Sequence, residues 1–463
     1  MFSKSTYVNR RKVLKEKLGK GLILFLGNDE SPMNYTDNTY HFRQDSTFLY
    51  YFGIQHPGLI AIIDIDNDKE IIFGDDFTID DIVFMGPKPK IFERAEQCGV
   101  KTAMKTADLE KVIGDAVAQK QHIHFLPLYR PENKIKLQDL IGIRPAEVKM
   151  KYSVDLVKAV VSQREVKTDE EIRQLTQAVD ISVDMHVAAM KFAKPGMTEV
   201  QVAAEIHRIA LAAGGNISFP IIATINGQTL HNHYHGNTIK EGDLFLIDAG
   251  FENEMMYAGD LSSTIPIAKK FTVEQKEIYQ LTLDAHRAAV YSLGVGIPFR
   301  NAHLAACKTI FDGLKTMGFT KGNTNDAIEV GAHALFFPCG TGHMMGLDVH
   351  DMEDLGEVWV GYDGQPKSMQ FGLKSLRLAK RLQTGHVFTI EPGIYFIPEL
   401  MDLWRSQNKF NDFIIWEKVN EYRDFGGIRN EEDYLMTESG AKLLGKQKPM
   451  TIEEIEAIRL EFG

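Results

Sequence analysis

Two aspartates, Asp248 and Asp260, lie at the ends of apolar segments, DLFLIDAG and YAGDLSSTIPI, that predict two adjacent β-strands. The polar stretch at residues 252–254 supplies a turn between them. If strand pairing is centred on Glu254, the two aspartates stand directly opposite each other, with Cβ atoms about 5 Å apart. Because like charges at this spacing repel, either one carboxyl holds a proton or a cation lies between them.

Three later segments add ionisable side chains beside apolar strands. They are GTGHMMGLDVHD with His343 and His350, FTIEPGIYF with Glu391, and GGIRNEEDYLMT with Glu431. Four carboxylates and one imidazole suit two divalent ions such as Mn²⁺, Mg²⁺ or Co²⁺ better than a thiolate-rich zinc site. Two ions about 3.5–4 Å apart can activate water and polarise a carbonyl at the same time, which is hydrolytic chemistry.

Helices with clear start signals precede these strands. Capping boxes at residues 168–171, 198–201 and 272–275 each predict the start of a helix, and a further helix is expected over about 300–317. Each helix pair is followed by strand-like segments that carry the candidate ligands. The order predicts a domain built by internal duplication of a helix pair plus antiparallel sheet, although no sequence repeat accompanies it.

The N-terminal part of the chain has a different pattern. Short strands alternate there with helical stretches near residues 5–18 and 107–119, which indicates an α/β domain. The expected strands cover residues 22–26, 59–65, 70–73 and 122–125. We therefore predict an α+β protein with an N-terminal α/β domain at 1–160 and a catalytic domain at 161–463.

Composition excludes several classes of function. The 463 residues carry a net charge of −11, which argues against nucleic-acid and membrane partners. The apolar run at 22–26 is too short to cross a membrane. Cys98, Cys307 and Cys339 form no CxxC pair and are expected to be reduced thiols in a cytoplasmic protein. The chain also lacks HExxH, GxSxG, P-loop and GxGxxG motifs.

Taken in order, the five metal-site segments resemble a known family, the metallopeptidases that include prolidase, aminopeptidase P and methionine aminopeptidase and have the pita-bread fold. The segment YHFRQDSTFLYYFGI also resembles the N-terminal module of aminopeptidase P and prolidase, which methionine aminopeptidase lacks. The resemblance therefore covers most of the chain. It implies a pita-bread catalytic domain preceded by an aminopeptidase P-like N-terminal domain.

Position by position, the resemblance implies a role for each candidate ligand. Asp248 would bind one metal ion, Asp260 and Glu431 would bridge both ions, and His343 and Glu391 would hold the second. Glu391 would also pass a proton from the attacking water to the leaving nitrogen. The implied cofactors are two divalent ions, with Mn²⁺ expected first and Co²⁺ or Zn²⁺ as alternatives.

Histidines outside the ligand set are expected to contact the substrate. His350 matches a family histidine that stabilises the tetrahedral intermediate. The segment TLHNHYHGN offers His231, His233 and His235 for a further substrate contact. His231 follows a leucine and lies 17 residues before Asp248, as in aminopeptidase P relatives, and His233 is the alternative.

Two arginines complete the candidate site. Arg377 stands where prolidases have an arginine that pairs with the substrate C-terminal carboxylate, although its cationic neighbours are equally compatible with surface charge. Arg429, two residues before Glu431, matches a family arginine that supports the metal ligands. Together with the long segment between Glu391 and Glu431, Arg377 favours an Xaa-Pro dipeptidase.

The alternative activity is that of an Xaa-Pro aminopeptidase acting on longer peptides. A third possibility is a pita-bread module that has lost its metals and only binds partners, against which the full ligand set argues. The expected substrates are small peptides with proline at position two. Relatives commonly assemble, so a homodimer or a higher homo-oligomer is also expected.

Overall fold

The computed structural model describes residues 1–462, which form two compact units. The N-terminal unit comprises Met1–Arg164 together with Met352–Trp359, and the larger unit comprises Glu165–Asp351 and the chain from Val360 onward. The division follows helix α8 (Val154–Arg164), whereas the boundary expected between residues 160 and 161 falls within that helix.

A five-stranded mixed sheet with the order β6-β5-β4-β1-β7 forms the centre of the N-terminal unit. Its strands are β1 (Leu22–Leu26), β4 (Ile60–Asp64), β5 (Lys69–Phe73), β6 (Thr102–Met104) and β7 (Ile123–His124). The three central strands are antiparallel, and the two edge strands are parallel to their neighbours. Buried side chains such as Leu24, Ile62 and Phe73 pack with Ile113 and Leu137 of the flanking helices to form its core.

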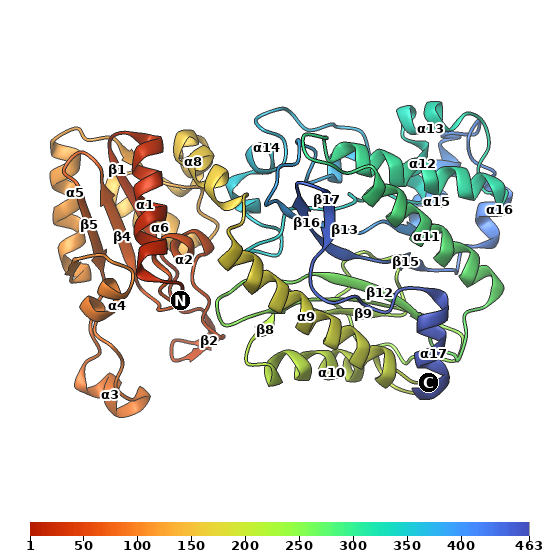
Figure 1. Ribbon diagram of the computed structural model, residues 1–463, viewed down its shortest axis with the longest axis horizontal. Coiled ribbons are helices and arrows are strands. Elements are labelled where there is room, and N and C mark those ends of the chain that lie inside the picture. The colour runs from red at the N-terminus through yellow and green to blue at the C-terminus, as the bar shows by residue number, and fades with distance from the viewer. Residues whose placement is uncertain (463) are drawn as a thin grey trace. The chain divides into compact units, whose positions relative to one another are not determined.

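Helices surround this sheet, and a small hairpin of β2 (Pro32–Tyr35) and β3 (Asn38–Thr39) lies beside it (Figure 1). The first helix begins where Ser3 accepts a hydrogen bond from the Thr6 amide and ends at Gly19, whose left-handed backbone favours glycine. This first helix is α1 (Lys4–Leu18). The helices that follow it are α2 (Ser46–Phe52), α3 (Ile79–Met85), α4 (Ile91–Gln97), α5 (Leu109–Ala118), α6 (Pro131–Ile141) and α7 (Val148–Lys151).

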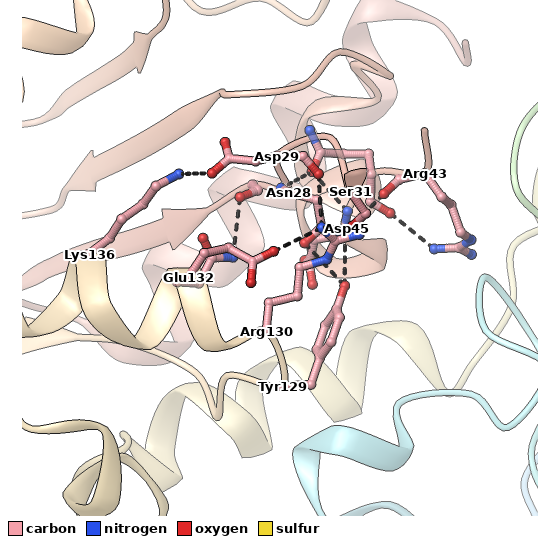
Figure 2. A network of polar contacts seen from close by, with 12 residues as sticks. Asn28, Asp29, Ser31, Arg43, Asp45, Tyr129, Arg130, Glu132 and Lys136 are labelled. Carbon is pink, nitrogen blue, oxygen red and sulfur yellow. Dashed lines mark hydrogen bonds and ion pairs between the residues drawn. The ribbon is translucent and has the colours of Figure 1, made fainter. Parts of the chain in front are cut away.

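A polar network fixes the loop that leaves β1 (Figure 2). Asn28 Nδ2 donates to the Tyr129 hydroxyl at 2.9 Å, and Arg130 Nη1 donates to the Asp29 carbonyl oxygen at 2.9 Å. Lys136 Nζ, on α6, contacts Asp29 Oδ2 at 2.5 Å. These contacts tie the loop to the start of α6, a helix that the sequence pattern did not reveal.

The larger unit repeats one arrangement twice. Its first half has helices α9 (Asp169–Phe192) and α10 (Glu199–Ala212), the sheet β12-β10-β9 and the ribbon β11-β8. Its second half has helices α11 (Val273–Tyr291) and α12 (Arg300–Thr316), the sheet β13-β16-β17 and the ribbon β14-β15. Figure 1 shows the two helix pairs on the outside of this unit, with the strands between them. The predicted α+β class and the duplicated helix pair plus antiparallel sheet are confirmed.

The capping boxes explain where three of these helices begin. Thr168, Thr198 and Thr272 are the N-cap residues of α9, α10 and α11, each with its partner three residues later. The strand bounds are β8 (Asn216–Ile217), β9 (Ile222–Thr224), β10 (Leu244–Ala249), β11 (Phe251–Glu252), β12 (Leu261–Pro266), β13 (Val387–Ile390), β14 (Gly393–Tyr395), β15 (Gly427–Arg429), β16 (Glu432–Thr437) and β17 (Gly440–Leu443). The remaining helices are α13 (Thr324–Val330), α14 (Glu357–Val360), α15 (Pro398–Ser406), α16 (Trp416–Glu421) and α17 (Ile452–Phe462).

The expected register of the aspartate hairpin is wrong by two residues. Strands β10 and β12 are antiparallel as expected, but Asp248 pairs with Ser262 and not with Asp260. The short strand β11 lies inside the connection and moves the pairing centre to Met255. Because the shift is an even number of residues, Asp260 stays on the same face as Asp248, as its diagonal neighbour.

Neither a membrane-spanning helix nor a disulfide is present among the described residues. None of the helices there combines the length and the apolar character that a membrane crossing requires. Cys98, Cys307 and Cys339 are all free, and the first two are buried.

Candidate metal centre

The five expected metal ligands lie at strand ends in the larger unit. Asp248 is near the end of β10, Asp260 directly precedes β12, Glu391 directly follows β13, and Glu431 directly precedes β16. His343 is on a loop next to β13, where its amide donates to Thr389 Oγ1 and its carbonyl oxygen accepts from the Thr389 amide. Strand ends from both halves of the unit therefore present these side chains to one pocket of about 550 Å³.

Three of these side chains approach one another closely enough to share a cation. Ligand atoms of Asp260, His343 and Glu431 all lie within 4.8 Å of one another. His343 Nε2 is 3.3 Å from Asp260 Oδ2 and 3.5 Å from Glu391 Oε1. The other ring nitrogen, Nδ1, is 3.0 Å from the Met344 carbonyl oxygen, to which Nδ1–H donates. With the proton on Nδ1, the neutral ring has a free lone pair on Nε2, and this nitrogen faces the carboxylates.

Two oxygen atoms of the buried carboxylates lack a protein partner within the described part of the chain. Asp260 Oδ1 and Glu431 Oε1 are buried and have no hydrogen-bond partner among the described residues. Burial and then the neighbouring Asp248 raise the pKa of Asp260 well above its usual value, and burial and then Asp260 do the same to Glu431. Oxygen-rich sites of this kind suit divalent cations, whose charge offsets the repulsion, so the donor set fits two such ions.

Asp248 and Glu431 are positioned by a network that centres on Arg429. The buried Arg429 guanidinium donates to Asp248 Oδ2, to Ser262 Oγ at 2.9 Å and to the Tyr395 hydroxyl at 3.1 Å. Ser262 Oγ in turn donates to Glu431 Oε2 at 2.7 Å. Arg429 thus contacts Asp248 directly and Glu431 through Ser262, so its guanidinium can orient both carboxylates.

Four residues of this centre were missed by the sequence analysis. Ser262 and Thr389 contact ligands directly, Thr389 Oγ1 being 3.3 Å from Glu391 Oε1, and Tyr395 accepts a hydrogen bond from Arg429. The fully buried Asp433 accepts a hydrogen bond from the Asp260 amide at 3.2 Å. Asp433 was detectable, since two-residue alternation along β16 puts it on the same face as Glu431.

The expected substrate-contacting residues line the same pocket. His231, His233, His350 and Arg377 all lie along its wall, whereas His235 does not and has Nε2 3.0 Å from the Ile221 carbonyl oxygen. The His350 and His343 rings are 4.2 Å apart between centroids. The Arg377 side chain is partly buried and lines the pocket wall.

His231 and His233 are the more exposed of the pocket histidines, each with over a third of its surface accessible. Local desolvation within the pocket and then the Arg429 charge nevertheless lower the pKa of His231. The ring is therefore mainly neutral near pH 7, and it can either accept or donate a hydrogen bond to a substrate.

A buried ion pair holds the loop that carries His343. Lys167 Nζ contacts Asp351 Oδ2 at 2.6 Å, and both side chains are almost completely buried. The Asp351 amide donates to the Met344 carbonyl oxygen, and the Met345 amide donates to Val387 of β13. The loop is thus tied at both ends to elements of the larger unit, which fixes the direction of the imidazole.

Comparisons with known proteins support the same chemistry. Residues 173–438 match the metallopeptidase family M24, and residues 7–124 match the aminopeptidase P N-terminal domain. The Xaa-Pro dipeptidase of Homo sapiens is 31% identical over 450 residues, which cover 94% of this chain and 88% of the relative. The Xaa-Pro aminopeptidase of Escherichia coli is 27% identical over 474 residues, which cover 98% of both chains.

Solved structures agree over the whole chain. Zinc-substituted aminopeptidase P of Escherichia coli in complex with product superposes with a TM-score of 0.81 at 25% identity, covering 100% of this chain and 99% of the other. The aminopeptidase of Pseudomonas aeruginosa gives a TM-score of 0.82 at 25% identity, covering 99% and 98%. The expected resemblance and the pita-bread fold are confirmed. The chain belongs to metallopeptidase family M24 and is a metal-dependent, proline-specific exopeptidase that acts on Xaa-Pro bonds.

Proposed function

We propose that this enzyme is an Xaa-Pro dipeptidase that uses two Mn²⁺ ions. The observation that carries the choice of a dipeptide is the place of Arg377, whose side chain lines the same pocket as the carboxylates and histidines. A guanidinium so near the reaction centre can bind the C-terminal carboxylate of a short substrate. The 31% identity to human Xaa-Pro dipeptidase favours the same activity.

The proposed metal ligands are Asp248, Asp260, His343, Glu391 and Glu431. Four carboxylates and one imidazole form a hard donor set that suits Mn²⁺, and Co²⁺ or Zn²⁺ are the alternatives. When bound, the two ions would supply Lewis-acid polarisation and activated water. The orphaned oxygens of Asp260 and Glu431 support binding of cations at this place.

The protein's own groups would then handle the substrate and its protons. Glu391 would accept a proton from the attacking water and give it to the proline nitrogen as the bond breaks. His350 would donate a hydrogen bond to the carbonyl oxygen as negative charge develops there. His231, with His233 as the alternative, would hold the substrate backbone, and Arg377 would set the distance to the substrate C-terminus.

The length of the substrate decides between a dipeptidase and the alternative, an Xaa-Pro aminopeptidase. The structures of aminopeptidase P relatives, which match the chain over almost its full length, are the observation that favours the alternative. A dipeptidase should hydrolyse Xaa-Pro faster than Xaa-Pro-Yaa at saturating Mn²⁺, because only the dipeptide places its carboxylate at Arg377. Faster hydrolysis of the tripeptide would favour the aminopeptidase.

Arg377→Ala tests the same point with a matched control. We expect the kcat/KM for Xaa-Pro to fall by about 100-fold or more, since a charged hydrogen bond contributes roughly 1.5–3 kcal/mol and a bidentate pair has two. The tripeptide should change little. The control is Arg381→Ala, which removes an exposed arginine of the same cationic run that donates to the Gly296 carbonyl oxygen. Equal losses on both substrates would remove Arg377 from the recognition of length.

Glu391→Gln tests the catalytic centre. The change keeps the size of the side chain but removes the proton acceptor, so turnover should be lost by several orders of magnitude. Exhaustive dialysis against a chelator should also abolish activity, and Mn²⁺ should restore it. Activity that survives chelation, or a variant that retains most of its turnover, would contradict the proposed mechanism.

A cytoplasmic location and a homodimeric assembly are also part of this proposal, and they rest on the sequence and the family resemblance. Light scattering of the purified chain would measure the assembly. A monomer with full activity would exclude any need for a partner subunit.

A further inference from the structure

A second cluster of metal-binding side chains lies outside the carboxylate pocket. His303 and Cys307 are four residues apart on α12, so they project from the same face of that helix. His333 lies on a short 3₁₀ helix at Ala332–Leu335. Ligand atoms of the three side chains all lie within 4.8 Å of one another, and each residue is at most 1% exposed.

His333 is the unusual member of this cluster. Neither of its ring nitrogens has a hydrogen-bond partner among the described residues, although the ring is fully enclosed. Buried polar atoms are almost always paired, so two orphaned nitrogens on one ring indicate a missing ligand. His303 is partly satisfied, since its Nδ1 is 2.9 Å from Thr341 Oγ1 and its Nε2 is 3.4 Å from Cys307 Sγ.

The chemistry of the three groups is that of a soft or borderline metal site. Burial lowers the pKa of His303 to about 3 and that of His333 to about 4, so both imidazoles are neutral and keep a free lone pair. Bonds of about 2.0–2.3 Å to one ion hold neighbouring N and S atoms roughly 3–4 Å apart. The cluster is only slightly wider than that, so small side-chain movements would close it around an ion.

We propose that His303, Cys307 and His333 form a further metal site, which binds one thiophilic transition-metal ion and is separate from the carboxylate centre. On binding, the Cys307 S–H bond breaks, the proton passes to water and an S–metal bond forms, with no change of oxidation state. One thiolate and two neutral imidazoles carry a charge of −1. Cu⁺ would neutralise it, whereas Zn²⁺ would leave a buried positive charge, so Cu⁺ is the better match.

The position of the cluster gives such an ion a structural role. Thr341, which contacts His303, also accepts a hydrogen bond at its carbonyl oxygen from the Glu391 amide at 2.7 Å. It lies two residues before His343. An ion held by α12 and the 3₁₀ helix would therefore brace the segment beneath the catalytic pocket without touching the substrate.

Co²⁺ is a suitable spectroscopic probe for the full-length protein, because it absorbs in the near ultraviolet only when a thiolate is bound. The proposed catalytic ligands contain no sulfur, so the carboxylate centre cannot produce this band. We expect the wild-type protein loaded with Co²⁺ to show the band and to hold one more ion per chain than Cys307→Ser. His333→Asn should also lose both. Cys98→Ser is the matched control, since it removes a buried thiol in the N-terminal unit, and it should keep both.

The Cu⁺ experiment uses competition with a coloured Cu⁺ chelator, from which the wild-type chain should withdraw one equivalent. X-ray absorption of that wild-type sample should show one sulfur and two nitrogen neighbours, a result that needs no folded variant. Binding of either Co²⁺ or Cu⁺ by Cys307, His303 and His333 supports the site. Comparison of the two experiments shows whether the site prefers a monovalent or a divalent ion. Absence of both signals overturns the proposal. A cobalt band that survives Cys307→Ser but disappears in Cys339→Ser also overturns it, because it places the ion in the substrate pocket.

Discussion

Ser262→Ala is the most direct test of how the protein orients its metal ligands. The completely buried Ser262 hydroxyl donates to Glu431 Oε2 at 2.7 Å and accepts from Arg429 Nε at 2.9 Å. The substitution removes one oxygen atom, keeps the strand and leaves both charged neighbours without this partner. Hydrogen bonds to charged groups contribute about 1.5–3 kcal/mol each, so the free energy of unfolding should fall by at least this amount.

The effect on the metals should be separable from the effect on stability. Loss of an orienting hydrogen bond beside a metal ligand commonly weakens metal binding about 10–100-fold. Ser263 is the matched control, because it is the next residue on β12, is equally buried and points to the opposite face. Its hydroxyl contacts His186 Nδ1 and Lys448 Nζ, not a proposed ligand. Ser263→Ala should therefore destabilise the fold but leave metal affinity within about twofold of wild type.

Two measurements on each variant decide the matter. Denaturant unfolding of the metal-loaded protein gives the stability change, and competition with a fluorescent chelator gives the affinity for Mn²⁺. If Ser262→Ala binds Mn²⁺ as tightly as wild type, the hydroxyl does not position Glu431. If both variants weaken binding equally, the loss reflects general destabilisation, and the argument from the β12 face is wrong.

Two further predictions concern the fold. Gly250→Ala should destabilise the larger unit by several kcal/mol or prevent folding, because the new Cβ would lie 1.8 Å from the Gly259 carbonyl oxygen. Its control is Gly114→Ala at an exposed position of helix α5, which should stabilise the protein by about 0.5–1 kcal/mol. The denaturant midpoints of the two variants measure both effects. Burial lowers the pKa of His286 to about 3 in the folded protein, whereas the pKa of histidine in the unfolded chain is near 6.5. The contribution of neutral His286 to the free energy of unfolding is therefore fully present above pH 6.5 and is lost as the pH falls toward 3. Between pH 7 and 5 the loss from this residue is about 2 kcal/mol, and His286→Gln should show a correspondingly flatter stability profile; an unchanged slope would contradict the neutral buried state.

The helices of the larger unit were predictable because their signals are local. A threonine with glutamate or glutamine three residues later satisfies exposed amides at a helix start, whatever packs against the helix. The observed N-caps at Thr168, Thr198 and Thr272 follow from this alone. Strand β1 was equally clear, since a continuous apolar run of five residues can only be buried on both faces.

The hairpin register could not be fixed in the same way. The sequence predicted that Asp248 and Asp260 share a face, but the pairing of Asp248 with Ser262 depends on the short strand β11, which pairs with β8. A two-residue strand has no periodicity to detect. Its position is decided by a segment more than thirty residues earlier in the chain.

The sequence by itself determined the kinds of group in the active centre, because metal-binding chemistry needs carboxylates and imidazoles and these stand next to recognisable apolar strands. Only the tertiary structure decided how they are held. Ser262 acts through a contact with Glu431, 169 residues away, and Tyr395 through a contact with Arg429, 34 residues away, and no local pattern marks such partners. Alternation along β16 marks the face on which Asp433 lies, but not its contact with the Asp260 amide, 173 residues away. The same holds for His333, whose meeting with His303 and Cys307 is created by packing between two separate helices.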